Sequence, residues 1–202
     1  DDAAAGWFRP FIGEKEFLQG GTRYIVHPDS IPPQELASLP DIRRRMEAVR
    51  RYRSESRSAP TKALSNQPGS FHVTVIPEEP FLVIPRVSSE RRDYLPVAWT
   101  APPVIPSDAV LILKDATLME FALLTSAMHM TWLRAVGGRL ESRYRYSVGV
   151  VYNAFPVPEI TPAKARKIEP LAQAVLDARA AFPDATLADL YDPVTMPAPL
   201  RK

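Results

Sequence analysis

Charged side chains alternate along one short segment of the sequence, "GRLESRYRYS" at residues 138–147. If this segment is extended, Glu141, Arg143 and Arg145 share one face, because successive side chains of a strand point to opposite sides. A carboxylate accepts a hydrogen bond from cytosine N4 and a guanidinium donates two bonds to guanine, so such a Glu–Arg pair can contact both halves of one C·G base pair. A surface ion-pair ladder, worth under about 1 kcal/mol, explains the same spacing. Spacing alone leaves both interpretations open.

No other group of residues has the spacing of a catalytic or metal centre. The chain has no cysteine and three histidines in unrelated contexts, so we expect no metal site. The nucleophile-elbow, P-loop and dinucleotide-binding glycine motifs are absent, and Ser126 with His129 on an apolar segment is weak evidence for a nucleophile. We expect His129 to be a hydrogen-bonded core residue. The chain itself is predicted to be a non-catalytic binder that holds no cofactor.

The composition is that of an ordinary globular protein, with 202 residues, 46% hydrophobic and 24% charged. A net charge of +2 means that a polyanionic partner must be met by a local patch. The absence of cysteine fits a reducing cytosol. The apolar stretch 117–136 contains Glu120, His129 and Arg134, so we expect a packed helix and no membrane span. Because the sequence starts without Met and ends at "PAPLRK", we expect a piece of a longer protein.

Proline and glycine divide the chain into expected elements. Strands are expected at 23–26, 71–76, 81–89, 95–100 and 109–113, where short β-branched runs end at prolines or charged turns. Helices are expected at 41–57 after Pro40, at 117–136 before Gly137, and at 162–182, with a short helix or turn at 9–18 and a polar connection at 58–70. Strands in the middle with helices around them predict an α+β fold. We expect a central, twisted, mostly antiparallel sheet built from residues 71–113 and 140–152, with one long packed helix at 117–136 and peripheral helices.

Aromatic side chains near the charged segment alternate away from its charged face. We expect these side chains to lie in the core and to fix the strand; they are Trp132, Tyr144, Tyr146, Tyr152 and Phe155. Asn153, which precedes Phe-Pro, is expected to cap or turn the chain.

Several longer strings carry a family resemblance. They are "SAMHMTWLRAVGGRLESRYRYSVGVVYNAFPVPE", "RPFIGEKEFLQG" near the start, "PFLVIPRVSSERRDYLPVAW" in the middle and the ending "LYDPVTMPAPLRK". Together they resemble the target recognition domain of the MmeI-like DNA methyltransferases, which are single-chain Type IIL or IIG restriction-modification enzymes. The pattern GRLxSxYRYS…VYNxFPxP is specific, whereas the regions 41–57 and 58–70 match loosely. We therefore expect a recognition domain at 1–160, with a helical insertion at about 33–57, and a helical extension at 161–202.

The resemblance implies a bacterial, cytoplasmic parent protein with an endonuclease domain, a helical spacer and an adenine-N6 methyltransferase domain. Such a parent would use S-adenosylmethionine for methylation and Mg for cleavage, and would flip its target adenine out of the duplex. The catalytic [DN]PP[YF] motif is absent, since "APPV" at 101 lacks the leading acid or amide and "NAFP" at 153 lacks the paired prolines. The implied partners are double-stranded DNA, contacted through the major groove, and the methyltransferase domain of the same protein, with no membrane.

The resemblance also implies which positions touch bases. Glu141 and Arg143 match the pair that reads the last base of a six-base site, next to the methylated adenine. The other two sets are Arg145 with Ala109, for the base before that adenine, and Arg86 with Asp108, for the base one step further upstream. We expect the charged side chains of these sets to converge on one exposed concave face; they are Arg86, Asp108, Glu141, Arg143 and Arg145. The expected phosphate contacts, which would position the protein without carrying sequence information, are Ser88, Arg91, Arg92, Lys114 and Arg139.

Two rival functions remain at this stage. The first is a protein-interaction or scaffold module in which the arginine-rich helix 41–57 binds acidic partners. The second is a hydrolase of an unmatched type, for which no acid–base pair stands out. DNA binding that weakens with salt, and keeps a sequence preference in the presence of competitor, would separate a DNA reader from both.

Overall fold

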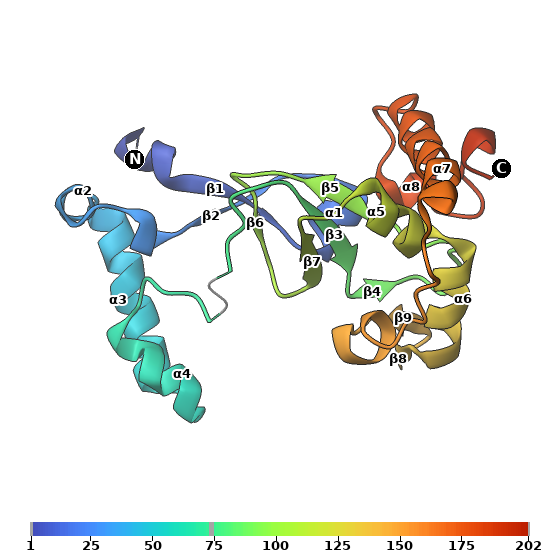
Figure 1. The fold of residues 1–202 in the computed structure, drawn as a ribbon. Helices are drawn as coiled ribbons and strands as arrows, with labels where there is room; N and C mark the ends of the chain where they lie inside the picture. Colours follow the sequence, from blue (N-terminus) through green and yellow to red (C-terminus); the bar gives the residue numbers. More distant parts are fainter. Residues whose placement is uncertain (1, 73–74, 202) are drawn as a thin grey trace. The chain divides into compact units, whose positions relative to one another are not determined.

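The computed structural model describes residues 2–72 and 75–201 of the chain (Figure 1). The chain forms two compact units, each interrupted in sequence. Unit 1 comprises residues 1–11 and 23–76, and unit 2 comprises residues 12–22 and 77–202.

Unit 1 combines a pair of antiparallel strands with short helices and one longer helix. Strand β1 (Phe8–Ile12) pairs with the antiparallel strand β2 (Arg23–Val26). The helical elements of this unit are η1 (Asp2–Trp7), η2 (Pro28–Ser30), α2 (Pro33–Ala37), α3 (Pro40–Ser54), α4 (Ala59–Ala63) and η3 (Leu64–Asn66). The start of α3 at Pro40 confirms the prediction, because the fixed φ of proline suits the first turn of a helix. The expected polar connection at 58–70 is wrong in part, since α4 and η3 occupy most of it.

Unit 2 contains two small antiparallel sheets of three strands each. In the first, β3 (Phe81–Pro85) lies between β5 (Ala98–Thr100) and β7 (Val110–Lys114). In the second, β9 (Arg143–Arg145) lies between β4 (Val87–Ser88) and β8 (Gly138–Leu140); β6 (Ile105–Pro106) is a further short strand of the unit. The predicted α+β class is confirmed. The predicted single central sheet is wrong, because the chain leaves the first sheet after Pro85 and enters the second at Val87. Residues 148–152 of the expected sheet form a π-helix.

Helices pack around these sheets. They are α1 (Glu14–Gln19), α5 (Leu118–Thr125), α6 (Ala127–Val136), the π-helix η4 (Val148–Tyr152), α7 (Pro162–Ala180), α8 (Leu187–Leu190) and η5 (Ala198–Leu200). The single helix predicted at 117–136 is wrong, because Ser126 has an extended backbone (φ −71°, ψ 153°) between α5 and α6. Its hydroxyl accepts a hydrogen bond from the amide of His129 at 3.0 Å, so Ser126 acts as the N-cap of α6. The predicted stop at Gly137 is confirmed as the C-cap of α6.

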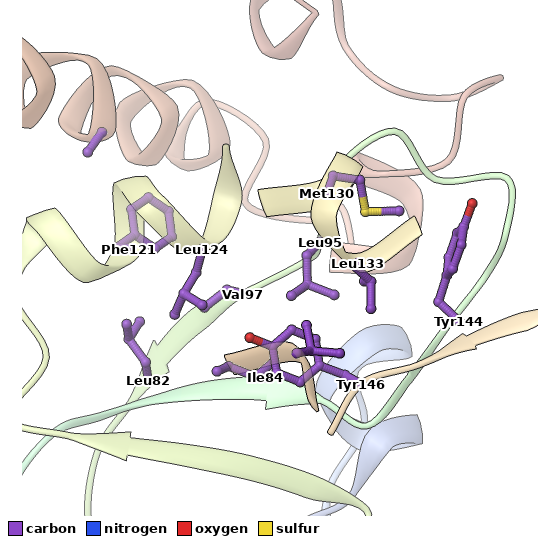
Figure 2. Close-up of a cluster of buried hydrophobic side chains, with 12 residues drawn as sticks. Leu82, Ile84, Leu95, Val97, Phe121, Leu124, Met130, Leu133, Tyr144 and Tyr146 are labelled. Atoms are coloured by element: carbon purple, nitrogen blue, oxygen red, sulfur yellow. The ribbon is translucent and has the colours of Figure 1, made fainter. Parts of the chain in front are cut away.

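The main core of unit 2 joins both sheets to α5 and α6. Figure 2 shows Tyr146 beside Ile84, with Leu95, Leu133 and Met130 nearby in the same cluster. The predicted burial of the aromatic residues is confirmed. Tyr144, Tyr146 and Phe155 are buried, and Trp132 and Tyr152 are partly buried against the same core.

Three further expectations need correction. Phe71, His72, Val75 and Ile76 are not in a strand, and residues 73 and 74 of the expected strand 71–76 lie outside the described residues. The expected strand at 95–100 is reduced to β5, and the expected helix or turn at 9–18 is mainly β1 followed by α1. Among the described residues, no helix has both the length and the apolar character needed to cross a membrane.

Candidate nucleic-acid interface

The charged segment forms a tight hairpin. Leu140 of β8 is paired with Arg143 of β9, so Glu141 and Ser142 are its two-residue connection. Glu141 has φ = 57°, a left-handed conformation that places it in the turn. The expectation that Glu141 shares a strand face with Arg143 and Arg145 is therefore wrong. Arg143 and Arg145 do lie on one side of β9, opposite the buried Tyr144 between them.

Glu141 and Arg143 nevertheless contact each other at the tip of the hairpin. Arg143 Nη2 donates to Glu141 Oε2 at 2.9 Å, and the side chains are 43% and 78% exposed, respectively. An exposed pair of this kind contributes little to stability, so its partners can be exchanged at small cost. The turn thus places an acceptor and a donor side by side in solvent.

Arg86 is the point at which the two sheets of unit 2 meet. Its amide donates to the carbonyl of Ala109 at 3.3 Å, and its carbonyl accepts from the amide of Tyr146 at 2.8 Å. These two hydrogen bonds bring the backbone of Arg86 next to Asp108–Ala109 on one side and to Arg145–Tyr146 on the other. Three segments that are up to 59 residues apart in sequence are thereby joined at one place.

The charged side chains at this junction are exposed. Within the described part of the chain, Arg86, Asp108 and Arg145 make no ion pair or side-chain hydrogen bond, and Ala109 is half-exposed. Arg143 lies two residues from Arg145 along β9, or roughly 7 Å at the usual rise of a strand. That spacing is about two base-pair steps of roughly 3.4 Å. The backbone therefore groups the predicted base-contacting residues within the reach of a few base pairs.

Most of the predicted phosphate contacts are already engaged with the protein. Arg91 lies 3.9 Å from Asp192, and the Arg139 guanidinium donates to the carbonyl of Ser142 at 3.1 Å and sits 3.8 Å from the ring centre of Tyr144. Ser88 is only 3% exposed, which argues against a phosphate contact by its side chain. Lys114 is exposed, but it lies five residues along β7 from Ala109, or roughly 17 Å.

Arg92 is a structural residue in this arrangement. Its Nη1 donates to the hydroxyl of Ser88 at 3.3 Å, and its Nε is buried without a partner among the described residues. Burial lowers the pKa of Arg92, and the carboxylates of Asp192 and Glu14 oppose that shift. The guanidinium therefore stabilises the loop after β4, and its side chain is only half-exposed.

A buried pair behind β9 holds the hairpin against α6. His129 Nε2 lies 2.9 Å from the Tyr146 hydroxyl, within hydrogen-bonding distance, and the two side chains are 1% and 2% exposed. Burial lowers the pKa of His129 to about 4 and raises the pKa of Tyr146. The predicted role of His129 as a hydrogen-bonded core residue is confirmed. The pair fixes Tyr146, whose amide binds Arg86 and whose chain neighbour is Arg145.

Two carboxylates near the hairpin had no local signal in the sequence. Glu14, at the start of α1, is half-buried; burial raises its pKa, while the nearby Arg143 and Arg92 lower it. Glu90 is exposed, and hydrogen bonds from its own amide and from Ser142 lower its pKa, helped by Arg139 and Arg143. Glu14 is far from Arg143 in sequence, although it lies in one of the strings that carry the family resemblance.

The described residues contain no group of three or more His, Cys, Asp or Glu side chains that could hold a metal ion. The segment "APPV" at 101–104 leads into β6, and its first three residues are exposed. Asn153 is the C-cap of η4, as predicted, and its amide donates to the carbonyl of Val148 at 2.8 Å. Neither segment has the residues of the [DN]PP[YF] motif.

Comparisons with known proteins bear on this geometry. The family model of the MmeI target recognition domain matches residues 1–159, and that of the MmeI C-terminal domain matches residues 160–202. DNA methyltransferase A of Bacillus subtilis (strain 168) is 37% identical over 195 residues, which are 96% of this chain and 22% of that protein.

A solved structure is also similar over the whole chain. It is the Type IIL restriction-modification enzyme MmeI in complex with DNA, with a TM-score of 0.97 and 37% identity, covering 100% of this chain and 27% of that one. The chain thus spans about a quarter of the length of these relatives.

Proposed function

Because the chain belongs to the family of MmeI target recognition domains, we propose that it reads base sequence in duplex DNA for a larger restriction-modification enzyme. The observation that carries this proposal is the junction at Arg86. There, backbone hydrogen bonds group Arg86, Asp108 and Arg145, whose charged groups are exposed and have no partner within the described residues. Charged groups that are positioned but unpaired suit base edges, which supply both donors and acceptors.

Each proposed set pairs chemically with one base pair in the major groove. Glu141 accepts from cytosine N4 while Arg143 donates to the guanine opposite, at the last base of the site. Arg86 and Asp108 use the same donor and acceptor chemistry at a second base pair, and Arg145 with Ala109 acts at a third. The exposed contact between Glu141 and Arg143 at 2.9 Å keeps the two groups together until base edges replace it.

We also propose that the parent protein methylates adenine N6 and cuts DNA. S-adenosylmethionine would supply the methyl group, and Mg would serve cleavage, in parts of the protein beyond this chain. In this proposal the methyltransferase domain of the same protein is the direct structural partner of the chain, and the complete enzyme acts in the bacterial cytoplasm. The role of the present residues is limited to selecting the DNA site.

Binding of the complete protein to duplexes that differ at one base pair tests the proposal. Arg145→Ala should relax the preference at a single position, at a cost of about 1 to 3 kcal/mol. Lys114→Ala, on an exposed cation at the far end of β7, should leave the order of preference unchanged. Complete protein that binds all duplexes equally in the presence of competitor would contradict the proposed function.

A further inference from the structure

The positive charge of the chain is concentrated in unit 1. Unit 1 carries ten Lys and Arg against seven Asp and Glu, whereas unit 2 carries fifteen against sixteen. Unit 1 is therefore +3 and unit 2, which holds the proposed base-contacting residues, is −1. Affinity for DNA comes largely from cations that displace counterions from phosphates. The unit that reads bases lacks the excess of cations that this affinity requires.

The cations of unit 2 near the hairpin are also occupied by the protein. Arg91 faces Asp192, Arg92 is half-buried on Ser88, and Arg134 donates to Asp93 at 3.3 Å. The contact with Ser88 holds Arg92 in the fold, whereas the pairs of Arg91 and Arg134 are exposed and compete only weakly with phosphate. A second source of phosphate contacts is therefore expected elsewhere in the chain.

Helix α3 and the three residues after it, Glu55, Ser56 and Arg57, supply such a source. Residues 40–57 contain seven arginines and three acidic residues, which is a net charge of +4. Arg45, Arg51 and Arg57 are exposed and have no ion pair or side-chain hydrogen bond among the described residues. Arg44 and Arg50 make only exposed pairs with Asp41 and Glu47, which are weak and exchangeable.

Helix α3 is held on unit 1 by a buried apolar residue and by side-chain hydrogen bonds. Ile42 is 5% exposed and packs in the core of unit 1. Arg53 is committed to the fold, because its guanidinium donates to the carbonyls of Leu64, Gln67 and Ser70 at 3.2, 2.7 and 2.7 Å. Arg45 and Arg51 lie six residues apart, or roughly 9 Å along the helix axis. Ile42 and Arg53 anchor one side of the helix. At about 100° per residue, Arg51 lies opposite Ile42, whereas Arg45 lies about 60° from Ile42 at the edge of the anchored side and is exposed.

We propose that α3 is a second DNA-binding surface, which contacts backbone phosphates of the duplex without reading its sequence. Guanidinium groups suit this task because their planar donors bind phosphate oxygens in pairs. The inference rests on the proposed function and gives the two units separate roles in it. Unit 2 selects the sequence, and unit 1 supplies the electrostatic part of the affinity. Acidic protein surfaces, the other class of partner that a basic helix could bind, are an outcome of the test.

The test compares two variants of the complete protein that lose the same charge. One is Arg45→Ala with Arg51→Ala on α3, and the other is Arg166→Ala with Lys167→Ala, which removes two exposed cations from α7. Binding to cognate and non-cognate duplexes is measured by fluorescence anisotropy at several salt concentrations. The α3 variant should lower the slope of log K against log salt by about 1 to 2, and weaken all duplexes by the same factor, roughly 10- to 100-fold near 0.1 M salt. The methylated sequence should not change.

Further results separate the possible failures. Arg45→Lys with Arg51→Lys keeps the charge and should keep most of the slope, whereas a purely structural role of these residues would reduce binding in both α3 variants. If the α3 alanine variant and the α7 variant have the same slope, α3 does not bind phosphates, and a protein partner becomes the better explanation. If the unmodified protein shows no sequence preference, the proposed function itself fails.

Discussion

The hairpin β8–β9 and the helix α3 are both rich in arginine, but their arginines are held in different ways. Behind the hairpin, Tyr146 is 2% exposed and contacts His129, and its amide donates a hydrogen bond to the carbonyl of Arg86. On α3, by contrast, Tyr52 is 75% exposed, and the neighbouring Arg51 has no partner among the described residues. Base recognition requires donors placed to a fraction of an ångström, whereas phosphate binding requires mainly charge. Charge alone therefore does not distinguish the proposed reading surface from α3, whereas the buried residues behind the hairpin do.

The largest expected difference between the two regions is in the stability that is lost when a tyrosine is truncated. Tyr146→Ala leaves a cavity in the main core and should lower the free energy of unfolding by about 3 to 5 kcal/mol. Tyr52→Ala removes an exposed ring and should change that free energy by about 0.5 kcal/mol or less. Denaturant unfolding of both variants measures the difference. Equal losses of stability in the two variants would contradict the view that the hairpin rests on a buried core whereas this face of α3 does not.

Acid should lower the free energy of unfolding by protonating His129 of the buried His129–Tyr146 pair. Burial lowers the pKa of His129 from 6.5 to about 4. Between these two pH values the unfolded chain binds a proton at this histidine, whereas in the folded chain the histidine stays mostly neutral. The stability contributed by neutral His129 is complete above pH 6.5 and is lost as the pH falls towards 4, up to about 3 kcal/mol. The free energy of unfolding measured between pH 7 and 4.5 should fall more steeply for the wild type than for His129→Gln.

The matched control for the pH experiment is another histidine of the chain. His72→Gln, on an exposed residue of unit 1, should follow the wild-type curve. If His129→Gln and the wild type lost stability in parallel on acidification, the buried pair would not be the pH-sensitive part of the scaffold.

A smaller effect is expected where α6 turns into the hairpin. A methyl group on Gly137 would lie 2.5 Å from the Leu133 carbonyl oxygen and 2.7 Å from Leu133 Cδ1, so Gly137→Ala must displace the end of α6. We expect a loss of about 1 to 3 kcal/mol in the free energy of unfolding. Gly149→Ala meets no atom within 4 Å and should be neutral or slightly stabilising. Thermal unfolding compares the two, and equal melting temperatures would show that this junction is not tightly packed.

Local rules predicted much of the scaffold from sequence. Pro40 marked the start of α3, Gly137 marked the end of α6, and the alternation around Arg145 placed Tyr144 and Tyr146 in the core. Each of these features depends on neighbours in sequence, through proline geometry, glycine capping or strand periodicity. The α+β class followed from the same local signals.

Features that depend on context or on distant contacts were missed. Glutamate has little intrinsic preference for positive φ, so the turn at Glu141 could not be foreseen. Ser126 occurs within an apolar run, and the break there depends on the cap that its hydroxyl makes. The junction at Arg86 needs Ala109 and Tyr146, which no local pattern connects to it. Accordingly, only the family resemblance predicts the individual base-contacting positions, and their grouping emerges only from the fold.

The most direct test of the central claim reverses the charges at the hairpin tip. Glu141→Lys with Arg143→Asp exchanges acceptor and donor across one turn, and Lys adopts the φ of 57° about as readily as Glu does. The new pair can form the same exposed ion pair, so folding should be preserved. Changing only one partner should instead weaken binding, because like or unpaired groups then face the base pair.

The measurement is a map of the sites methylated by the complete enzyme carrying both substitutions, obtained by sequencing. Glu141 accepting from cytosine and Arg143 donating to guanine require C as the last base on the methylated strand. The reversed pair should therefore change that base to G, with a discrimination of about 1 to 3 kcal/mol for each contact, and leave the other positions of the site unchanged. Methylated sites that keep C as their last base would contradict the claim that Glu141 and Arg143 read the DNA.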